Sequence, residues 1–210
     1  MSKGQALIVS GSAGSGKSTV LTPFKDGKVE PFRFSVSATT RQMRPGEVDG
    51  RDYLFVTKER FEQMIENGEL LEHAVFNKNY YGTPIAPVTA QIRDGKVVIL
   101  EIEVDGAEQV MRAFDKDDYL SVFISPPSYK ILEARLRARG TNTEEDILER
   151  LERAKEELEV ARLYDHILFN FDARSNDVTE AIKKLVCGED ITELDIYCKS
   201  FEELKKRFYE

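Results

Sequence analysis

Residues 11–18 read Gly-Ser-Ala-Gly-Ser-Gly-Lys-Ser and satisfy the pattern G-x-x-x-x-G-K-[ST] at every defined position. The apolar residues before them predict a short buried strand over Ala6–Ser10, and a helix is expected to begin near Lys17. Glycines let the backbone curl so that successive N–H groups point at one anion, and the helix adds its positive N-terminal end. This succession of strand, loop and helix predicts a phosphate-binding loop within an α/β fold.

The loop assigns roles to its polar residues. Lys17 is expected to reach the β- and γ-phosphates of a nucleotide, and the Ser18 hydroxyl is expected to ligate Mg²⁺. The loop alone does not separate a kinase from a GTPase, an ATPase or a sulfotransferase-like protein. Asn77–Tyr80 lacks the acidic fourth position of the base-reading N/T-K-x-D segment of switch-type GTPases, which weakens the GTPase interpretation. The predicted nucleotide-binding residues are Gly11, Ser12, Ala13, Gly14, Ser15, Gly16, Lys17, Ser18 and Thr19.

Strand-like and helix-like segments alternate along the rest of the chain. This alternation predicts a parallel sheet covered by helices on both faces, which is a three-layer α/β fold of the P-loop NTPase type. A chain of 210 residues without an internal repeat, low-complexity tract or linker fits a single domain. The expected strands are Phe32–Ser37, Val97–Ile102, Tyr119–Ile124 and His166–Phe169, and the expected helices are Lys58–Asn67, Ser128–Ala138, Thr143–Tyr164 and Asn176–Val186.

The net charge and the cysteine content limit the kinds of partner and metal site that the chain can have. A net charge of −8 argues against nucleic acid or an anionic membrane as the main partner, because phosphate backbones favour basic surfaces. The apolar run near the N-terminus is too short for a signal peptide or a membrane span. Cys187 and Cys198 form no CxxC pair, so both are expected to be unpaired thiols rather than metal ligands. A cytoplasmic location is the expectation.

Two further segments, Ser37–Glu47 and Glu72–Thr83, resemble the GMP-binding region of guanylate kinases. The resemblance includes the phosphate-binding loop, Glu101–Gly106 and Arg139-Gly140-Thr141 with the helix after it, and it covers roughly residues 5–186. It implies a core of about residues 5–34, 96–127 and 158–186, a GMP-binding insertion (about 35–95), a helical lid (about 128–157) and a helical tail (about 189–210). Several motifs in one order are more specific than the loop alone.

The loop-rich segment from Arg41 to Tyr53 contains groups suited to a phosphate. Guanidinium forks pair with phosphate oxygens, and a phenol adds a neutral donor. Arg41, Arg44, Tyr53 and Tyr81 are therefore expected to hold the α-phosphate of GMP. Taken alone, either arginine is more simply a solvated surface charge, and the expectation depends on the four residues together.

Glu72 is the expected guanine reader. A carboxylate can accept hydrogen bonds from guanine N1–H and the exocyclic 2-amino group, whereas adenine offers neither donor on that edge. Taken alone, Glu72 is most simply a surface charge. The resemblance implies that Ser37, Gly82, Thr83 and an acidic residue at Glu103 complete the pocket.

Glu101 and Glu103 follow an apolar strand, and their spacing places both on one side of the sheet. Ligands bind at the carboxyl ends of strands in open α/β sheets. We therefore expect Glu101 to contribute to the Mg²⁺ shell, directly or through water, and Glu103 to face the guanine. Many family members have aspartates at these positions, and the alternative is a pair of solvated charges.

The second half of the chain is expected to close over ATP. Arg135, Arg139 and Arg150 match arginines on or beside the lid of guanylate kinases, and Asn170 matches a residue near the adenine. Arg137 and Arg153 are instead assigned to pairing with glutamates of their own helices. Two departures from the family pattern are Ser12 in place of a frequent proline and Phe171 in place of a common aspartate. The expected catalytic residues are Lys17, Arg41, Arg139 and Arg150.

The resemblance implies the reaction ATP + GMP → ADP + GDP with Mg²⁺. One alternative is another nucleoside monophosphate kinase, which the Glu72 pocket argues against. The other is a non-catalytic guanylate-kinase-like scaffold, which tends to lack the phosphate-binding loop that is intact here. The tail is expected to be an amphipathic helix that packs on the core through Ile196, Phe201, Leu204 and Phe208. The sequence does not decide between a monomer and a homo-oligomer.

Overall fold

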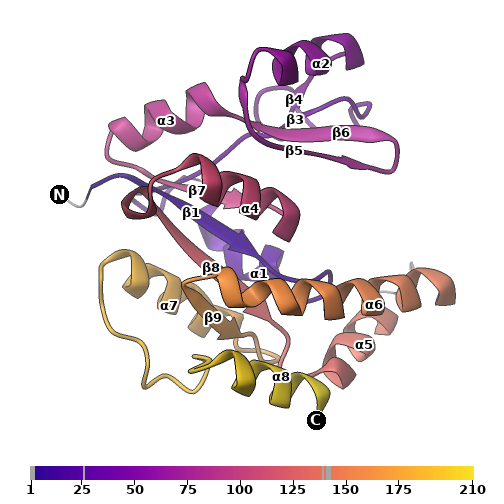
Figure 1. Cartoon of the computed structure of the whole chain (residues 1–210), viewed down its shortest axis with the longest axis vertical. Helices are drawn as coiled ribbons and strands as arrows, with labels where there is room; N and C mark the ends of the chain where they lie inside the picture. The colour runs from indigo at the N-terminus through magenta and orange to yellow at the C-terminus, as the bar shows by residue number, and fades with distance from the viewer. Residues whose placement is uncertain (1–2, 26, 139, 141–142) are drawn as a thin grey trace. The chain divides into compact units, whose positions relative to one another are not determined.

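The computed structural model describes residues 3–25, 27–138, 140 and 143–210 (Figure 1). The chain divides into two compact units. Unit 1 comprises Met1–Leu7 and Gly27–Tyr119, and unit 2 comprises Ile8–Asp26 and Leu120–Glu210. Each unit therefore combines two separate stretches of chain, and the first boundary between units falls within the strand that precedes the phosphate-binding loop.

The larger sheet contains, in this order, the strands β2 (Phe32–Phe34), β7 (Val97–Glu101), β1 (Gln5–Ser10), β8 (Tyr119–Ser125) and β9 (His166–Phe169). β2 pairs with β7, and β8 pairs with β9, in parallel register. Most residues of β1, β7, β8 and β9 are buried, as expected for strands of a parallel sheet. The α/β class with a parallel sheet is confirmed, and β2 ends three residues earlier than predicted.

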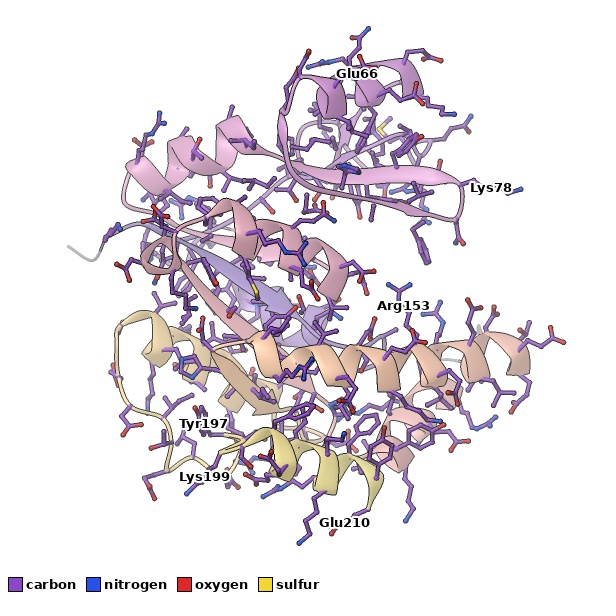
Figure 2. All side chains as sticks on the ribbon, in the orientation of Figure 1. Glu66, Lys78, Arg153, Tyr197, Lys199 and Glu210 are labelled. Atoms are coloured by element: carbon purple, nitrogen blue, oxygen red, sulfur yellow. The ribbon has the colours of Figure 1, made fainter. Side chains whose placement is uncertain are left out.

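Unit 1 contains a second sheet that the sequence did not predict. It has four strands in the order β4 (Leu54–Phe55), β3 (Ala38–Thr39), β6 (Asn79–Pro84) and β5 (Leu70–Phe76). The β3–β6 and β6–β5 pairs are antiparallel, whereas β3 and β4 are parallel. β5 and β6 form a hairpin, with Asn77 and Lys78 at its turn in left-handed conformations and Lys78 at the tip (Figure 2).

Helix α2 (Lys58–Glu66) matches the predicted helix within one residue. Thr57 caps its N-terminus by accepting a hydrogen bond from the Arg60 backbone at 3.2 Å, and Gly68 follows its end with φ +64°. The apolar face of α2 presents Phe61 and Met64 to a small core that includes Ala38. The second sheet is therefore fixed by α2 packing as well as by its hydrogen bonds.

Two more helices belong to unit 1, α3 (Ile85–Arg93) and α4 (Val104–Ala113). α3 packs against β7, and α4 packs against β5. α4 begins directly after the loop that follows β7, and its buried residues include Val104, Gly106, Ala107 and Val110. This helix therefore connects the end of a strand in the larger sheet to the edge strand of the smaller one.

Unit 2 contains α1 (Lys17–Leu21), α5 (Tyr129–Ala138), α6 (Glu144–Val160), α7 (Ser175–Val186) and α8 (Phe201–Tyr209). α6 starts at a capping box, in which Thr143 and Asp146 each accept a hydrogen bond from the other's backbone N–H. A 3₁₀ turn over Ala161–Leu163 follows it. α1 packs against α7, and α5 packs against α6. The predicted helices are present, with bounds shifted by a few residues.

The tail forms less helix than predicted, because α8 covers only its last part (Figure 1). The residues before α8 pair with β9 instead. The Phe169 backbone N–H donates to Ile196 O at 2.7 Å, and the Cys198 N–H donates to Ile167 O at 3.0 Å. Ile196, Leu204 and Phe208 are buried, whereas Phe201 is half-buried. Packing of the tail within unit 2 is confirmed.

Candidate active site

The phosphate-binding loop of unit 2 depends on its glycines. Gly11, Gly14 and Gly16 have φ values of +146°, +97° and +90°, which other residues rarely adopt. A Cβ on Gly11 would overlap Ile124 O, and one on Gly16 would overlap the Asn170 amide. The loop is therefore held between β8 and the segment after β9, and a side chain at Gly11 or Gly16 would not fit there.

Lys17 and the two hydroxyl residues after it stand at the start of α1. Lys17 Nζ donates to Gly11 O and lies 3.4 Å from Ser12 O, so the ammonium spans the loop. Ser18 and Thr19 are exposed, so their hydroxyl groups are accessible to a ligand. Within the loop, Ser12, Gly14 and Ser15 are buried, and Ala13 and Gly16 are half-buried. The structure therefore places these residues in one loop and at the start of α1, and their roles toward a nucleotide stay predictions.

Arg135 and Asn170 meet at the carbonyl of Ser15. Asn170 Nδ2 donates to Ser15 O at 2.9 Å, and Arg135 Nη1 lies 3.4 Å from the same oxygen. Arg135 Nη2 also donates to Asn170 O at 2.7 Å and to Asp172 Oδ1 at 2.6 Å. Asn170 is only 2% exposed, so its amide is a fixed support of the loop. The structure thus brings together two residues assigned to ATP by resemblance.

Two more arginines, Arg139 and Arg150, were predicted to act on the ATP side. Arg150 lies half-buried on α6, and the predicted Arg139 lies outside the described residues. Arg137 pairs with Glu133 and Glu144, and Arg153, labelled in Figure 2, pairs with the buried Glu157 one turn away. The prediction that Arg137 and Arg153 pair with glutamates is confirmed. The role of Arg150 stays a prediction.

In unit 1, Arg41 lies among two tyrosines and a carboxylate. Its guanidinium donates to both carboxylate oxygens of Glu47, at 2.8 and 3.0 Å, and lies 5.2 Å from the ring centre of Tyr53. The rings of Tyr53 and Tyr81 make an edge contact, with 6.1 Å between centroids. Arg41 is therefore not a solvated surface charge. Arg44 has an exposed side chain, and its backbone N–H donates to Glu47 at 2.7 Å.

Glu72 is buried, with an exposed fraction of 6%. Thr83, its partner across β5 and β6, donates from Oγ1 to Glu72 Oε1 at 2.6 Å. Burial raises the pKa of Glu72, although the two hydrogen bonds to Thr83 oppose that shift. The interpretation of Glu72 as a surface charge is wrong. A buried carboxylate with further acceptor capacity suits a ligand that offers donors.

The other residues predicted to bind GMP are Ser37, Gly82 and Glu103, and Glu101 is predicted to contribute to the Mg²⁺ shell. Ser37 is half-buried directly before β3, and Gly82 is buried within β6. Glu101 is the last residue of β7 and half-buried, whereas Glu103 is exposed at the N-cap position of α4. β7 ends before Glu103, so the strand alternation expected to align both glutamates stops at Glu101. Among the described residues, no cluster of three or more His, Cys, Asp or Glu side chains could hold a metal ion alone.

Comparison with known proteins identifies the family. The guanylate kinase family model matches residues 3–187. A guanylate kinase of Lactobacillus acidophilus is 42% identical over 204 residues, covering 96% of this chain and 98% of its own. One from a Nostoc species is 47% identical over 169 residues, covering 80% and 83%. The chain belongs to the guanylate kinase family.

A crystal structure of guanylate kinase from Anaplasma phagocytophilum matches with a TM-score of 0.67 and 28% identity, covering 99% of this chain and 96% of that one. This match extends the sequence likeness to the fold, and the predicted resemblance is confirmed. In the part of the chain that the structure describes, none of the helices has the length and apolar character needed to cross a membrane.

Sequence reasoning missed two carboxylates that pair with predicted site arginines. Glu47 pairs with Arg41, and this pairing, helped by the Arg44 N–H, lowers the pKa of Glu47 to about 2. Asp172 pairs with Arg135, one position after the phenylalanine that replaces a common aspartate. Neither carboxylate has a distinctive local signal, because Glu47 is 6 positions from Arg41, where most acidic residues are solvated, and Asp172 is 37 positions from Arg135.

Proposed function

We propose that this chain transfers the γ-phosphoryl group of ATP to GMP, giving ADP and GDP. ATP:GMP phosphoryl transfer is the reaction of the family to which the chain belongs. The observation that carries the proposal for this chain's own residues is the buried Glu72–Thr83 pair. A carboxylate kept out of water and hydrogen-bonded on one oxygen is a specific receptor for a base with two adjacent N–H donors.

Guanine presents these donors on N1–H and the 2-amino group, and Glu72 accepts from both. Ser37, Gly82, Thr83 and Glu103 line the rest of the base pocket in this proposal. AMP leaves the buried carboxylate without donors, and sites of this kind can reject an analogue by about 10⁴–10⁵. Selectivity for GMP over AMP therefore follows from the charge that AMP would leave unpaired.

The phosphate of GMP binds Arg41 and Arg44, with Tyr53 and Tyr81 as neutral donors. Arg41 is held by Glu47 and by the two rings, so its guanidinium stays in place before the substrate arrives. Its remaining N–H groups and those of Arg44 offset the negative charge of the acceptor, which otherwise repels ATP. This neutralisation makes the acceptor oxygen available as a nucleophile.

ATP binds the phosphate-binding loop, with Lys17 on the β- and γ-phosphates. Ser18 is exposed at the start of α1, and an alcohol oxygen with phosphate oxygens and waters fits the hard-oxygen shell of Mg²⁺. Glu101 would contribute to that shell through water. Mg²⁺ would neutralise charge on the transferring phosphates, whose oxygens would supply further ligands.

Catalysis then consists of positioning and charge neutralisation. The acceptor is already an oxyanion, so no general base is needed. Arg135, Arg139 and Arg150 act on the ATP side, in a lid of about residues 128–157, and GMP binds an insertion of about residues 35–95. Closure of both excludes water and limits hydrolysis of ATP.

A substrate panel tests the proposal directly. ADP release is measured with ATP, Mg²⁺ and each of GMP, AMP, CMP and UMP. Turnover confined to GMP supports the reaction and the guanine pocket together. Strong turnover of another monophosphate would support kinase activity but contradict the proposal that Glu72 selects guanine. A folded protein that binds ATP but turns over none of them would instead be a scaffold.

A further inference from the structure

Helix α4 holds the backbone next to Glu72 through one side chain, Gln109. The His73 backbone N–H donates to Gln109 Oε1 at 3.1 Å, and Gln109 Nε2 donates back to His73 O at 3.2 Å. Gln109 Nε2 also lies 3.3 Å from Asp105 O on its own helix. One amide therefore satisfies both backbone groups of the residue that follows Glu72.

This clamp occupies a position where a neighbouring strand is missing. β5 is the last strand in the order of the four-stranded sheet, so one side of its backbone has no strand beside it. A primary amide matches the donor and acceptor of a peptide group, and Gln109 pairs with His73 as a strand residue would. The clamp fixes the register of α4 against β5 at the residue beside the proposed guanine reader.

Gly106, three residues earlier on the same helix, contacts Glu72 itself. A Cβ on Gly106 would lie 2.9 Å from Glu72 Oε2, 3.3 Å from its Cδ and 3.4 Å from its Cγ. Gly106 is buried and keeps an ordinary helical φ, so glycine is needed for space rather than for backbone conformation. The helix surface at Gly106 therefore sets how far the carboxylate can move toward α4.

The Glu72 carboxylate is thus limited on two sides. Thr83 holds Oε1 across the strand pair, and the bare backbone of Gly106 lies against Oε2. The Thr83 contact is fixed by the pairing of β5 with β6, whereas the Gly106 contact keeps its position only while α4 stays in register with β5, and Gln109 provides that register. Residues three apart lie on one face of a helix, so a single face carries both contacts.

We propose that Gln109 and Gly106 are positioning residues for base selection, which hold Glu72 where it reads the 2-amino group of guanine. This inference rests on the proposed function of Glu72. Neither residue needs to touch the nucleotide. Gln109 acts by holding the backbone of β5. Gly106 leaves room for the Glu72 carboxylate and limits how far that carboxylate can move toward α4.

The test compares GMP with IMP, which lacks only the 2-amino group. The variants are Gln109→Met, which keeps the side-chain length but removes the clamp, and Gly106→Ala, which moves Oε2. Arg112→Ala, at an exposed position of α4, is the matched control. The measured quantity is the ratio of kcat/KM for GMP to kcat/KM for IMP. Partial unfolding lowers both values by the same factor and therefore leaves the ratio unchanged.

We expect Gln109→Met and Gly106→Ala to lower this ratio about tenfold or more, since displacement of a positioning group by about 1 Å can cost 10²-fold. KM for ATP and the Arg112→Ala ratio should not change. If both variants kept the wild-type ratio while Glu72→Gln abolished it, the positioning role would be refuted and the guanine reader retained. A wild-type enzyme without preference for GMP would instead refute the proposed function of Glu72.

Discussion

Replacing Glu72 by glutamine separates the contribution of this residue to stability from its contribution to substrate selection. The amide keeps the shape of the side chain, and its oxygen can still accept from Thr83. The amide nitrogen then takes the place of Oε2 and presents donors to the donors of guanine. Glu72→Gln therefore loses two charge-assisted hydrogen bonds to the base and leaves the surrounding packing intact.

The magnitude of the catalytic effect follows from these two bonds. Hydrogen bonds to a charged group contribute about 1.5–3 kcal/mol each, so kcat/KM for GMP should fall by about 10²–10⁴-fold. KM for ATP should stay unchanged, because the phosphate-binding loop belongs to the other unit. Steady-state rates with GMP varied at saturating ATP, and then with ATP varied, measure both quantities.

Stability should change in the opposite direction. Burial raises the pKa of Glu72 above its ordinary value of 4.5, so its contribution to stability is fully present below pH 4.5 and is lost as pH rises through the raised value. At neutral pH the variant, which has no such charge to bury, should unfold at an equal or higher urea concentration than the wild type. This advantage should disappear below pH 4.5.

Either of two observations would refute this account of Glu72. If Glu72→Gln turned over GMP at the wild-type rate, the carboxylate would not read the base. If the variant were less stable than the wild type at neutral pH, the ionised carboxylate would be a net stabilising group and its burial would not carry the cost argued here. Either observation is decisive without the other.

Three further predictions concern the rest of the molecule. Glu47→Gln should lower the free energy of unfolding at neutral pH, because Arg41 lowers the pKa of Glu47 to about 2 and the ionised carboxylate stabilises the fold above its ordinary pKa. The loss of stability should shrink as pH falls toward 2. An equal loss at neutral pH and near pH 2 in urea titrations would contradict this prediction. Asn170→Ala should raise KM for ATP about tenfold without raising KM for GMP, because it removes a buried hydrogen bond of about 1–2 kcal/mol to Ser15 O. An equal rise of KM for both substrates would show a general loss of structure instead. Phe208→Ala should cost about 3–5 kcal/mol, because the ring is buried against Tyr129, and an unchanged thermal midpoint would show that the tail does not contribute to folding.

The larger sheet and the helices of unit 2 could be predicted because their signals are local. Buried parallel strands are continuous apolar runs, and β1, β7, β8 and β9 fit that description. Glycine at left-handed positions of a loop is also a local requirement. The phosphate-binding loop could therefore be placed between a strand and a helix from sequence alone.

The second sheet could not be predicted as a whole because β3 and β4 are specified by distant partners, although β5 and β6 form a local hairpin. β3 and β4 have two residues each, which is too short for any periodicity. Thr39 Oγ1 donates to Tyr80 O, and Thr40 Oγ1 accepts from the Tyr80 N–H, across some forty positions of sequence. Side chains that fix the backbone of a remote strand leave no local pattern, and the tail residues that pair with β9 were missed for the same reason.

The same distinction explains which site residues could be assigned and which could not. Lys17, Arg41 and Glu72 could be assigned as candidates because they are charged, and a guanine nucleotide has phosphate oxygens and N–H donors that such charges can bind. Gln109 offers only a neutral amide and acts on the backbone of His73. Asn170, also a neutral amide, was assigned only through the family resemblance, and its hydrogen bond to Ser15 O was not predicted. An amide on a helix face or after a strand is ordinarily a solvated residue, so its sequence context does not distinguish it. The residues that contact substrate can be predicted from the chemistry of the substrate, whereas those that hold them in place can be identified only once the fold is known.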